Sequence, residues 1–85
     1  MVSFTYVIKD ELGLHARPAG ALTKEVLKWK STVTIDNGTK KADARRLIAV
    51  MGMGVKKGHE ITVSVEGEDE VACMEAMQKF FAENL

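Results

Sequence analysis

The chain has 85 residues, with 12 basic and 12 acidic side chains and a formal net charge of zero. This length has room for one domain, residues 1–85, with a modest core, and the charge balance argues against nucleic-acid binding. No apolar run reaches the roughly 18 residues of a membrane span, and the N-terminus lacks the pattern of a signal peptide. The single cysteine, Cys73, cannot form an internal disulfide, which is compatible with a reducing cytoplasm. We therefore expect a cytoplasmic protein without membrane insertion.

Residues 2–9 alternate apolar and polar side chains, which predicts a half-buried strand. From Ala16 to about Trp29 apolar residues recur at helical spacing, so we expect an amphipathic helix with Trp29 packed in the core. Gly20 and Ala21 lie one turn after the start of this helix. They leave a low surface that another protein can approach, although glycine costs about 1 kcal/mol of helix stability relative to alanine.

The second half of the chain continues with two strands, a short helix, a strand and a helix. Residues 32–36 and 39–43 flank Asn37-Gly38, a signal for a two-residue hairpin turn. Residues 45–53 predict a short helix, residues 56–58 a turn, and residues 61–66 a fourth strand. Acidic residues 68–70 open the last helix, whose predicted buried face consists of Val71, Met74, Met77 or Gln78, and Phe81.

This order of elements, β-α-β-β-α-β-α, predicts an α+β fold. We expect an open-faced two-layer sandwich in which a four-stranded antiparallel sheet carries three helices on one face.

The run Gly13-Leu14-His15-Ala16-Arg17-Pro18-Ala19 places a histidine at or near the N-cap of the first helix. Pro18 falls in the first turn, where its missing N–H costs nothing. A helix N-terminus offers unpaired N–H groups and a positive dipole end, both suited to an anion. The guanidinium of Arg17 matches phosphate oxygens. The run therefore favours a phosphoryl group as ligand.

His15 can act as the nucleophile in such a site. The helix dipole and Arg17 disfavour the charged form of the imidazole, which leaves a ring lone pair available. After attack on a phosphoryl donor, the new dianion lies among the N–H donors of Ala16 and Arg17 and the guanidinium. A lone histidine more often only caps a helix; the neighbours of His15 favour the chemical role.

This run resembles the active-site signature of HPr, the histidine-containing phosphocarrier family of bacterial sugar phosphotransferase systems. A second stretch, residues 47–55 followed by Lys57-Gly58, is similar to the short helix and loop that the family uses beside its histidine. The resemblance covers essentially the whole chain. It implies that enzyme I phosphorylates His15 on Nδ1, that Arg17 is its electrostatic partner, and that His15 passes the group to a IIA domain of a sugar permease.

Part of residues 47–53 should face outward, because a short helix over one sheet edge cannot bury all of its apolar side chains. The resemblance favours Leu47, Ile48 and Met51 as the outward set, with Val50 in the core. We expect the full docking surface for partner proteins to consist of Gly20, Ala21, Lys24, Leu47, Ile48, Met51 and Gly54. We expect a monomer, since a carrier must keep this surface free.

One departure from the family concerns regulation. Many Gram-positive members carry a serine at the start of the second stretch, where a dedicated kinase phosphorylates it, but this chain has Arg46. Arginine cannot be modified in that way, so this regulatory branch is not transferred. Arg45 and Arg46 could favour an acidic partner surface, although exposed arginines are usually only solvated.

Two other classes of function compete with a sugar-system carrier. An acylphosphatase would also hold phosphate by an arginine near a helix mouth, but it needs a polar residue such as asparagine to orient water, and none lies near His15 in the sequence. We therefore expect a phosphoryl carrier without independent turnover. A regulatory carrier of a nitrogen-related phosphotransferase branch remains open. No cofactor is indicated, and His59 has no second ligand at metal-binding spacing, so no metal is expected.

Overall fold

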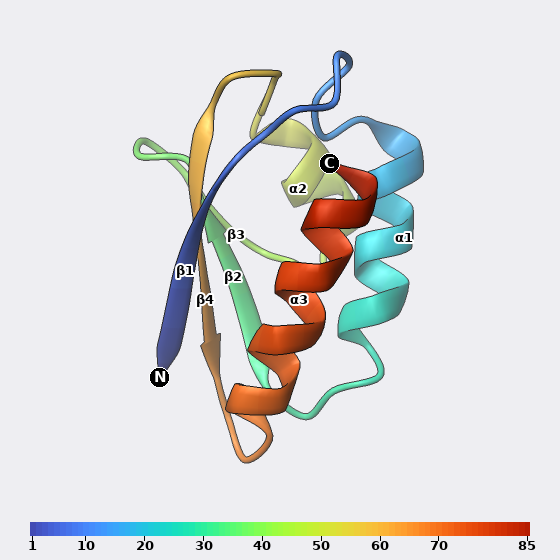
Figure 1. Cartoon of the computed structure of the whole chain (residues 1–85). Helices are drawn as coiled ribbons and strands as arrows, with labels where there is room; N and C mark the ends of the chain where they lie inside the picture. Colours follow the sequence, from blue (N-terminus) through green and yellow to red (C-terminus); the bar gives the residue numbers. More distant parts are fainter.

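The computed structural model describes all 85 residues (Figure 1). The elements follow the predicted order β-α-β-β-α-β-α. They are β1 (Val2–Val7), α1 (Ala16–Val26), β2 (Thr32–Asp36), β3 (Lys41–Asp43), α2 (Leu47–Gly52), β4 (Glu60–Glu66) and α3 (Glu70–Asn84).

The four strands form one antiparallel sheet in the order β1-β4-β2-β3. Figure 1 shows all three helices on the same side of this sheet, so the predicted open-faced sandwich is confirmed. β4 is central and pairs with both β1 and β2, which places the first strand of the chain at one edge of the sheet.

The core lies between the sheet and the helices. In β2 and β4 every second residue is buried, which is the pattern of strands with one covered face. Phe81 of α3 is fully buried and makes edge contacts with the rings of Phe4, Tyr6 and Phe80, with centroids 5.7–6.1 Å apart. These contacts fix α3 against β1.

α1 begins at Ala16 as predicted but ends three residues earlier than expected, at Val26. After Val26 the backbone forms a tighter turn, in which Trp29 donates its N–H to the carbonyl of Val26, three residues back. The Trp29 side chain is half-buried against the core, and its indole N–H donates to Glu25 at 3.3 Å. The packing role predicted for Trp29 is confirmed, although the residue lies outside the helix. β1 also ends early, at Val7.

The predicted two-residue hairpin turn is wrong. Asp36 pairs with Lys41, so residues 37–40 form a four-residue loop and β3 begins at Lys41 rather than Thr39. The cause lies in Asn37, whose side-chain oxygen accepts the backbone N–H groups of Thr39 and Lys40 at 3.0 and 2.7 Å. These local bonds stabilise the wider loop in place of two further ladder positions.

α2 and α3 are both shorter than predicted at their N-terminal ends, starting at Leu47 and Glu70. The predicted burial of Val71 is wrong: its side chain is 57% exposed. The buried residues of α3 are Cys73, Met77 and Phe81, four residues apart. Val71 precedes Cys73 by two residues and so lies on nearly the opposite side of the helix. Gln78 is exposed, and Met74 is half-buried.

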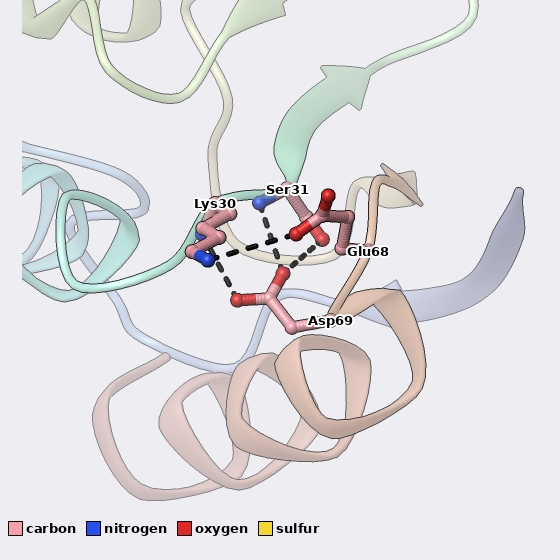
Figure 2. Close-up of polar contacts among 4 residues, drawn as sticks. All are labelled: Lys30, Ser31, Glu68 and Asp69. Carbon is pink, nitrogen blue, oxygen red and sulfur yellow. Dashed lines mark hydrogen bonds and ion pairs between the residues drawn. The ribbon is translucent and has the colours of Figure 1, made fainter.

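Asp69 connects the start of α3 to the loop between α1 and β2 (Figure 2). Its carboxylate accepts the backbone N–H groups of Lys30 and Ser31, each at 3.0 Å, and the hydroxyl of Ser31. The Ser31 hydroxyl, followed by the Lys30 N–H, lowers the pKa of Asp69. Figure 2 also shows Lys30 beside Glu68, but this 3.6 Å ion pair is strongly exposed and contributes little to stability.

Candidate functional site

The segment between β1 and α1 carries His15, and it is held by backbone contacts to distant parts of the chain. Gly13 has a positive φ of 68°, and a Cβ there would lie 2.3 Å from the carbonyl oxygen of Val55. Leu14 is buried and donates its N–H to that same oxygen at 3.0 Å. Glycine is needed here for both its backbone conformation and its lack of a side chain. The loop is therefore fixed against the segment that follows α2.

His15 is the N-cap residue of α1, as predicted. Its backbone is extended (φ −85°, ψ −175°), and its carbonyl accepts the N–H of Ala19 at 3.0 Å. The side chain makes no capping hydrogen bond and is 28% exposed. The imidazole therefore does not cap the helix through a hydrogen bond, and part of the ring is open to solvent.

The first turn of α1, which follows His15 directly in the chain, offers two backbone donors without a partner. Pro18 has no N–H and lies buried within this turn, and Ala19 already donates to His15. The free N–H groups are consequently those of Ala16 and Arg17, both exposed residues. The Arg17 guanidinium takes part in none of the ion pairs within the chain. This arrangement can receive a dianion next to His15.

A carboxylate that the sequence reasoning did not single out lies beside the histidine. Asp10 places its Oδ1 atom 3.8 Å from His15 Nε2, and its side chain is 23% exposed. The same oxygen accepts the backbone N–H of Leu12 at 2.8 Å, which orients the carboxylate. An aspartate at the start of a loop often accepts a hydrogen bond from the backbone N–H two residues later, and this pattern could have indicated that Asp10 turns toward the histidine loop.

α2 contacts α1, and Figure 1 places it at the same end of the molecule as the start of α1. The Thr23 hydroxyl of α1 donates to the carbonyl of Ala44, just before α2, at 3.1 Å. Leu47, Ile48 and Met51, which we call the α2 patch, are 37%, 80% and 40% exposed. The predicted outward set is therefore exposed, while Val50 and Met53 are buried.

The remaining residues of the predicted docking surface are also accessible. Ala21, Lys24 and Gly54 are exposed. Gly20 is half-exposed, and a Cβ added to it would meet no atom within 4 Å. The surface around Gly20 is open, as expected from its small residues.

The two arginines before α2 differ. Arg46 is the exposed N-cap residue of α2 and makes no side-chain cap. Arg45 donates from Nη2 to the carbonyls of Trp29 and Ser31, both at 3.3 Å. Arg45 thus holds the loop after α1, whereas the Arg46 side chain makes no hydrogen bond or ion pair within the chain.

The structure has no group of three or more histidine, cysteine or acidic side chains that could hold a metal ion. His59 is exposed, and its Nδ1 accepts the backbone N–H of Lys56 at 3.2 Å. None of the helices has the length and apolar character needed to cross a bilayer.

Comparison with known proteins shows similarity over nearly the whole chain. Residues 2–83 match the family model described as the PTS HPr component phosphorylation site. The chain is 38% identical over 79 residues to the phosphocarrier protein HPr of Mycoplasma capricolum, covering 93% of this chain and 89% of that protein.

Solved structures show the same fold. The histidine-containing phosphocarrier protein of a Mycoplasma superposes with a TM-score of 0.93 at 35% identity, covering 96% of this chain and 93% of that one. An HPr dimer from Thermoanaerobacter tengcongensis gives a TM-score of 0.76 at 31% identity, covering 98% and 95%. Relatives of this chain thus include a dimeric form.

Proposed function

Because this chain belongs to the HPr family and is a phosphocarrier of the phosphotransferase system, we propose that His15 is the residue that carries the phosphoryl group, bonded at Nδ1. The observation that carries this proposal is the position of His15: it is the N-cap of α1, its side chain makes no cap, and it is partly exposed. Enzyme I would supply the phosphoryl group, and a IIA domain of a sugar permease would receive it.

In the proposed reaction the lone pair on His15 Nδ1 attacks the phosphorus atom of the donor. The N–P bond forms while the bond to the donor's leaving atom breaks, and that atom keeps the electron pair. The phosphoryl oxygens then lie at the start of α1, where the N–H groups of Ala16 and Arg17 and the guanidinium stabilise their charge. Pro18 contributes by fixing the backbone of this turn.

Partner proteins would dock over both helices that flank the histidine. The exposed α2 patch supplies an apolar centre, and flexible methionine suits a surface that must fit two partners in turn. Gly20, Ala21, Lys24 and Gly54, which are all accessible, would complete the docking surface. The chain takes part in phosphotransfer, and we propose that it acts as a monomeric cytoplasmic carrier, a single domain over residues 1–85, without turnover of its own.

The test is the intact mass of the protein after incubation with phosphoenolpyruvate and enzyme I. We expect one added phosphoryl group that brief acid treatment removes, because a P–N bond is labile. His15→Ala should gain no mass while keeping its circular dichroism spectrum. An unmodified parent protein, or a His15→Ala variant modified to the same extent, would contradict the proposal.

A further inference from the structure

We infer that Asp10 is a positioning residue for His15: its carboxylate holds the proton of the imidazole on Nε2 and so leaves the lone pair on Nδ1. This inference rests on the proposed phosphorylation of His15 at Nδ1 and names the residue that selects this nitrogen.

The side chains of Asp10 and His15 lie next to each other in the structure. Oδ1 of Asp10 lies 3.8 Å from Nε2 of His15, and both side chains are partly shielded, at 23% and 28% exposure. A carboxylate beside one nitrogen of a neutral imidazole favours the tautomer that carries its proton on that nitrogen, because the N–H then points at the negative charge. The other nitrogen becomes the nucleophile.

The carboxylate is held in place by the loop. Leu12 donates its N–H to Oδ1 of Asp10 at 2.8 Å, and Gly13 donates its N–H to the Asp10 carbonyl at 2.9 Å. Both ends of Asp10 are thus tied to the turn that precedes His15. The structure shows no hydrogen bond to His15 Nδ1, and the His15 side chain makes no capping hydrogen bond at the start of α1.

Charge balance during transfer gives the same assignment. When neutral His15 attacks through Nδ1 and keeps its proton on Nε2, the phosphorylated ring carries a positive charge. The Asp10 carboxylate faces the nitrogen that holds this proton. In the onward step the Nδ1–P bond breaks and the bonding electrons return to Nδ1, so the ring leaves as neutral imidazole. A ring that had lost its Nε2 proton would have to leave as an anion, which is a far poorer leaving group. Asp10 therefore supports both acceptance and release of the phosphoryl group.

The experiment compares the parent chain with Asp10→Asn and Asp10→Ala. Asparagine keeps an oxygen that can accept the Leu12 N–H but loses the charge, whereas alanine removes both. Nitrogen-15 NMR of the unphosphorylated imidazole, recorded at a pH where the ring is neutral, reports which nitrogen carries the proton. We expect the parent to show Nε2–H almost alone, and the Nδ1–H signal to grow in Asp10→Asn and further in Asp10→Ala.

The matched control is Glu11→Gln. It removes the same charge from the next residue, whose side chain is 87% exposed and faces Lys57 at 3.8 Å. We expect the control to keep the parent tautomer and the parent rate of phosphorylation, and Asp10→Asn to be phosphorylated about tenfold more slowly. A tenfold change in rate corresponds to about 1.4 kcal/mol in the activation free energy.

The outcomes separate the two proposals. Failure of the parent chain to accept a phosphoryl group would overturn the proposed function, whatever the tautomer. A phosphorylated parent whose tautomer and rate match those of both folded Asp10 variants would overturn the role of Asp10 alone. An equal effect of Glu11→Gln would also overturn it, since general loss of negative charge would then explain the result.

Discussion

Asp69 and Ser31 are 38 positions apart in the sequence, yet the Asp69 carboxylate accepts both the backbone N–H and the hydroxyl of Ser31. Ser31 is fully buried, and the contact joins the start of β2 to the start of α3. Nearby, a Cβ added to Gly67 would lie 2.6 Å from Ser31 Cα, so the two segments approach closely. The Asp69 side chain thus links two elements that lie far apart in the sequence.

The first prediction concerns the pH dependence of this contact. The hydroxyl of Ser31, with the Lys30 N–H, lowers the pKa of Asp69 in the folded protein below its ordinary value of 3.8. A group with a lowered folded pKa stabilises the protein above its unfolded pKa, and this stabilisation is lost as the pH falls through the folded value. The urea midpoint of the parent should exceed that of Asp69→Asn at pH 7, and the gap should shrink below about pH 4.

The control for this experiment is Glu68→Gln, because Glu68 is strongly exposed and its ion pair with Lys30 should contribute little. Its urea midpoint should stay near that of the parent at every pH. A gap between the parent and Asp69→Asn that is the same at pH 7 and pH 2 would show that the charge of Asp69 is unimportant.

The second prediction tests the glycine that holds the histidine loop. In Gly13→Ala the new Cβ would overlap the Val55 carbonyl, and the backbone would be strained at φ 68°. We expect a loss of about 2–4 kcal/mol in the free energy of unfolding, from strain and steric overlap together. Because the loop must move, phosphorylation of His15 should also slow. Chemical denaturation and a phosphorylation time course measure the two effects.

Gly38→Ala is the matched control, since Gly38 also has a positive φ, of 96°, but a Cβ there would meet no atom within 4 Å. Its free energy of unfolding should fall by only about 1 kcal/mol, from backbone strain alone, and its rate of phosphorylation should equal that of the parent. Equal effects of the two substitutions would remove the Val55 contact from the explanation.

The third prediction concerns Arg17. Arg17→Ala should still accept a phosphoryl group on His15, because the ring and the N–H groups of the first turn remain, but transfer should be roughly 10- to 100-fold slower. Arg17 is exposed and forms no ion pair within the chain, so the free energy of unfolding should hardly change. Rapid-quench measurement of phosphoryl transfer at saturating donor distinguishes slow chemistry from weak binding. A variant with the parent rate would exclude the guanidinium from the site.

The fourth prediction concerns the α2 patch. Met51→Glu places a charge on a 40% exposed side chain, so the fold should survive, while affinity for enzyme I and for a IIA domain should fall about 5- to 30-fold. Isothermal titration with each partner measures this loss. Val71→Glu, which changes an exposed apolar side chain on α3, is the control. If Met51→Glu keeps the parent affinity for both partners, Met51 is not part of the docking surface.

The fifth prediction is that a substitution at Gly20 raises the stability of the fold but weakens partner binding. The position is helical and open, so Gly20→Ala should raise the free energy of unfolding by about 0.5–1 kcal/mol. The added methyl group would stand on the proposed docking surface and should weaken partner binding. Higher stability combined with unchanged affinity for both partners would show that the low surface at Gly20 has no docking role.

Much of this structure could be predicted because local patterns agree with the fold. Alternating side chains identified β1 and β4, the turn signal at Asn37-Gly38 identified β2 and β3, and the position of Pro18 helped to fix the start of α1 at Ala16. The errors at the hairpin and in the buried face of α3 arose where contacts outside the local pattern determine the structure. Asn37 folds onto its own loop and widens the hairpin, and the register of α3 against the sheet, which puts Val71 in solvent, depends on packing that a single helical pattern does not determine.

At the site, the sequence identified His15 and the helix start that follows it, because these residues are neighbours in the chain. It did not identify Asp10, since the approach of its carboxylate to His15 depends on the turn at residues 10–13. It also could not show that the histidine ring leaves the helix end uncapped, which is a matter of side-chain orientation.

The order of strands in the sheet has a consequence for biosynthesis. β1 leaves the ribosome before β4, which is its only neighbour in the sheet, and the loop that follows β1 is held by Val55 and Leu85. Until residues 55–66 have emerged, β1 has no partner strand, and the contacts of the histidine loop with Val55 and Leu85 cannot all form. Competence of His15 to accept a phosphoryl group, as proposed above, should therefore arise late in translation.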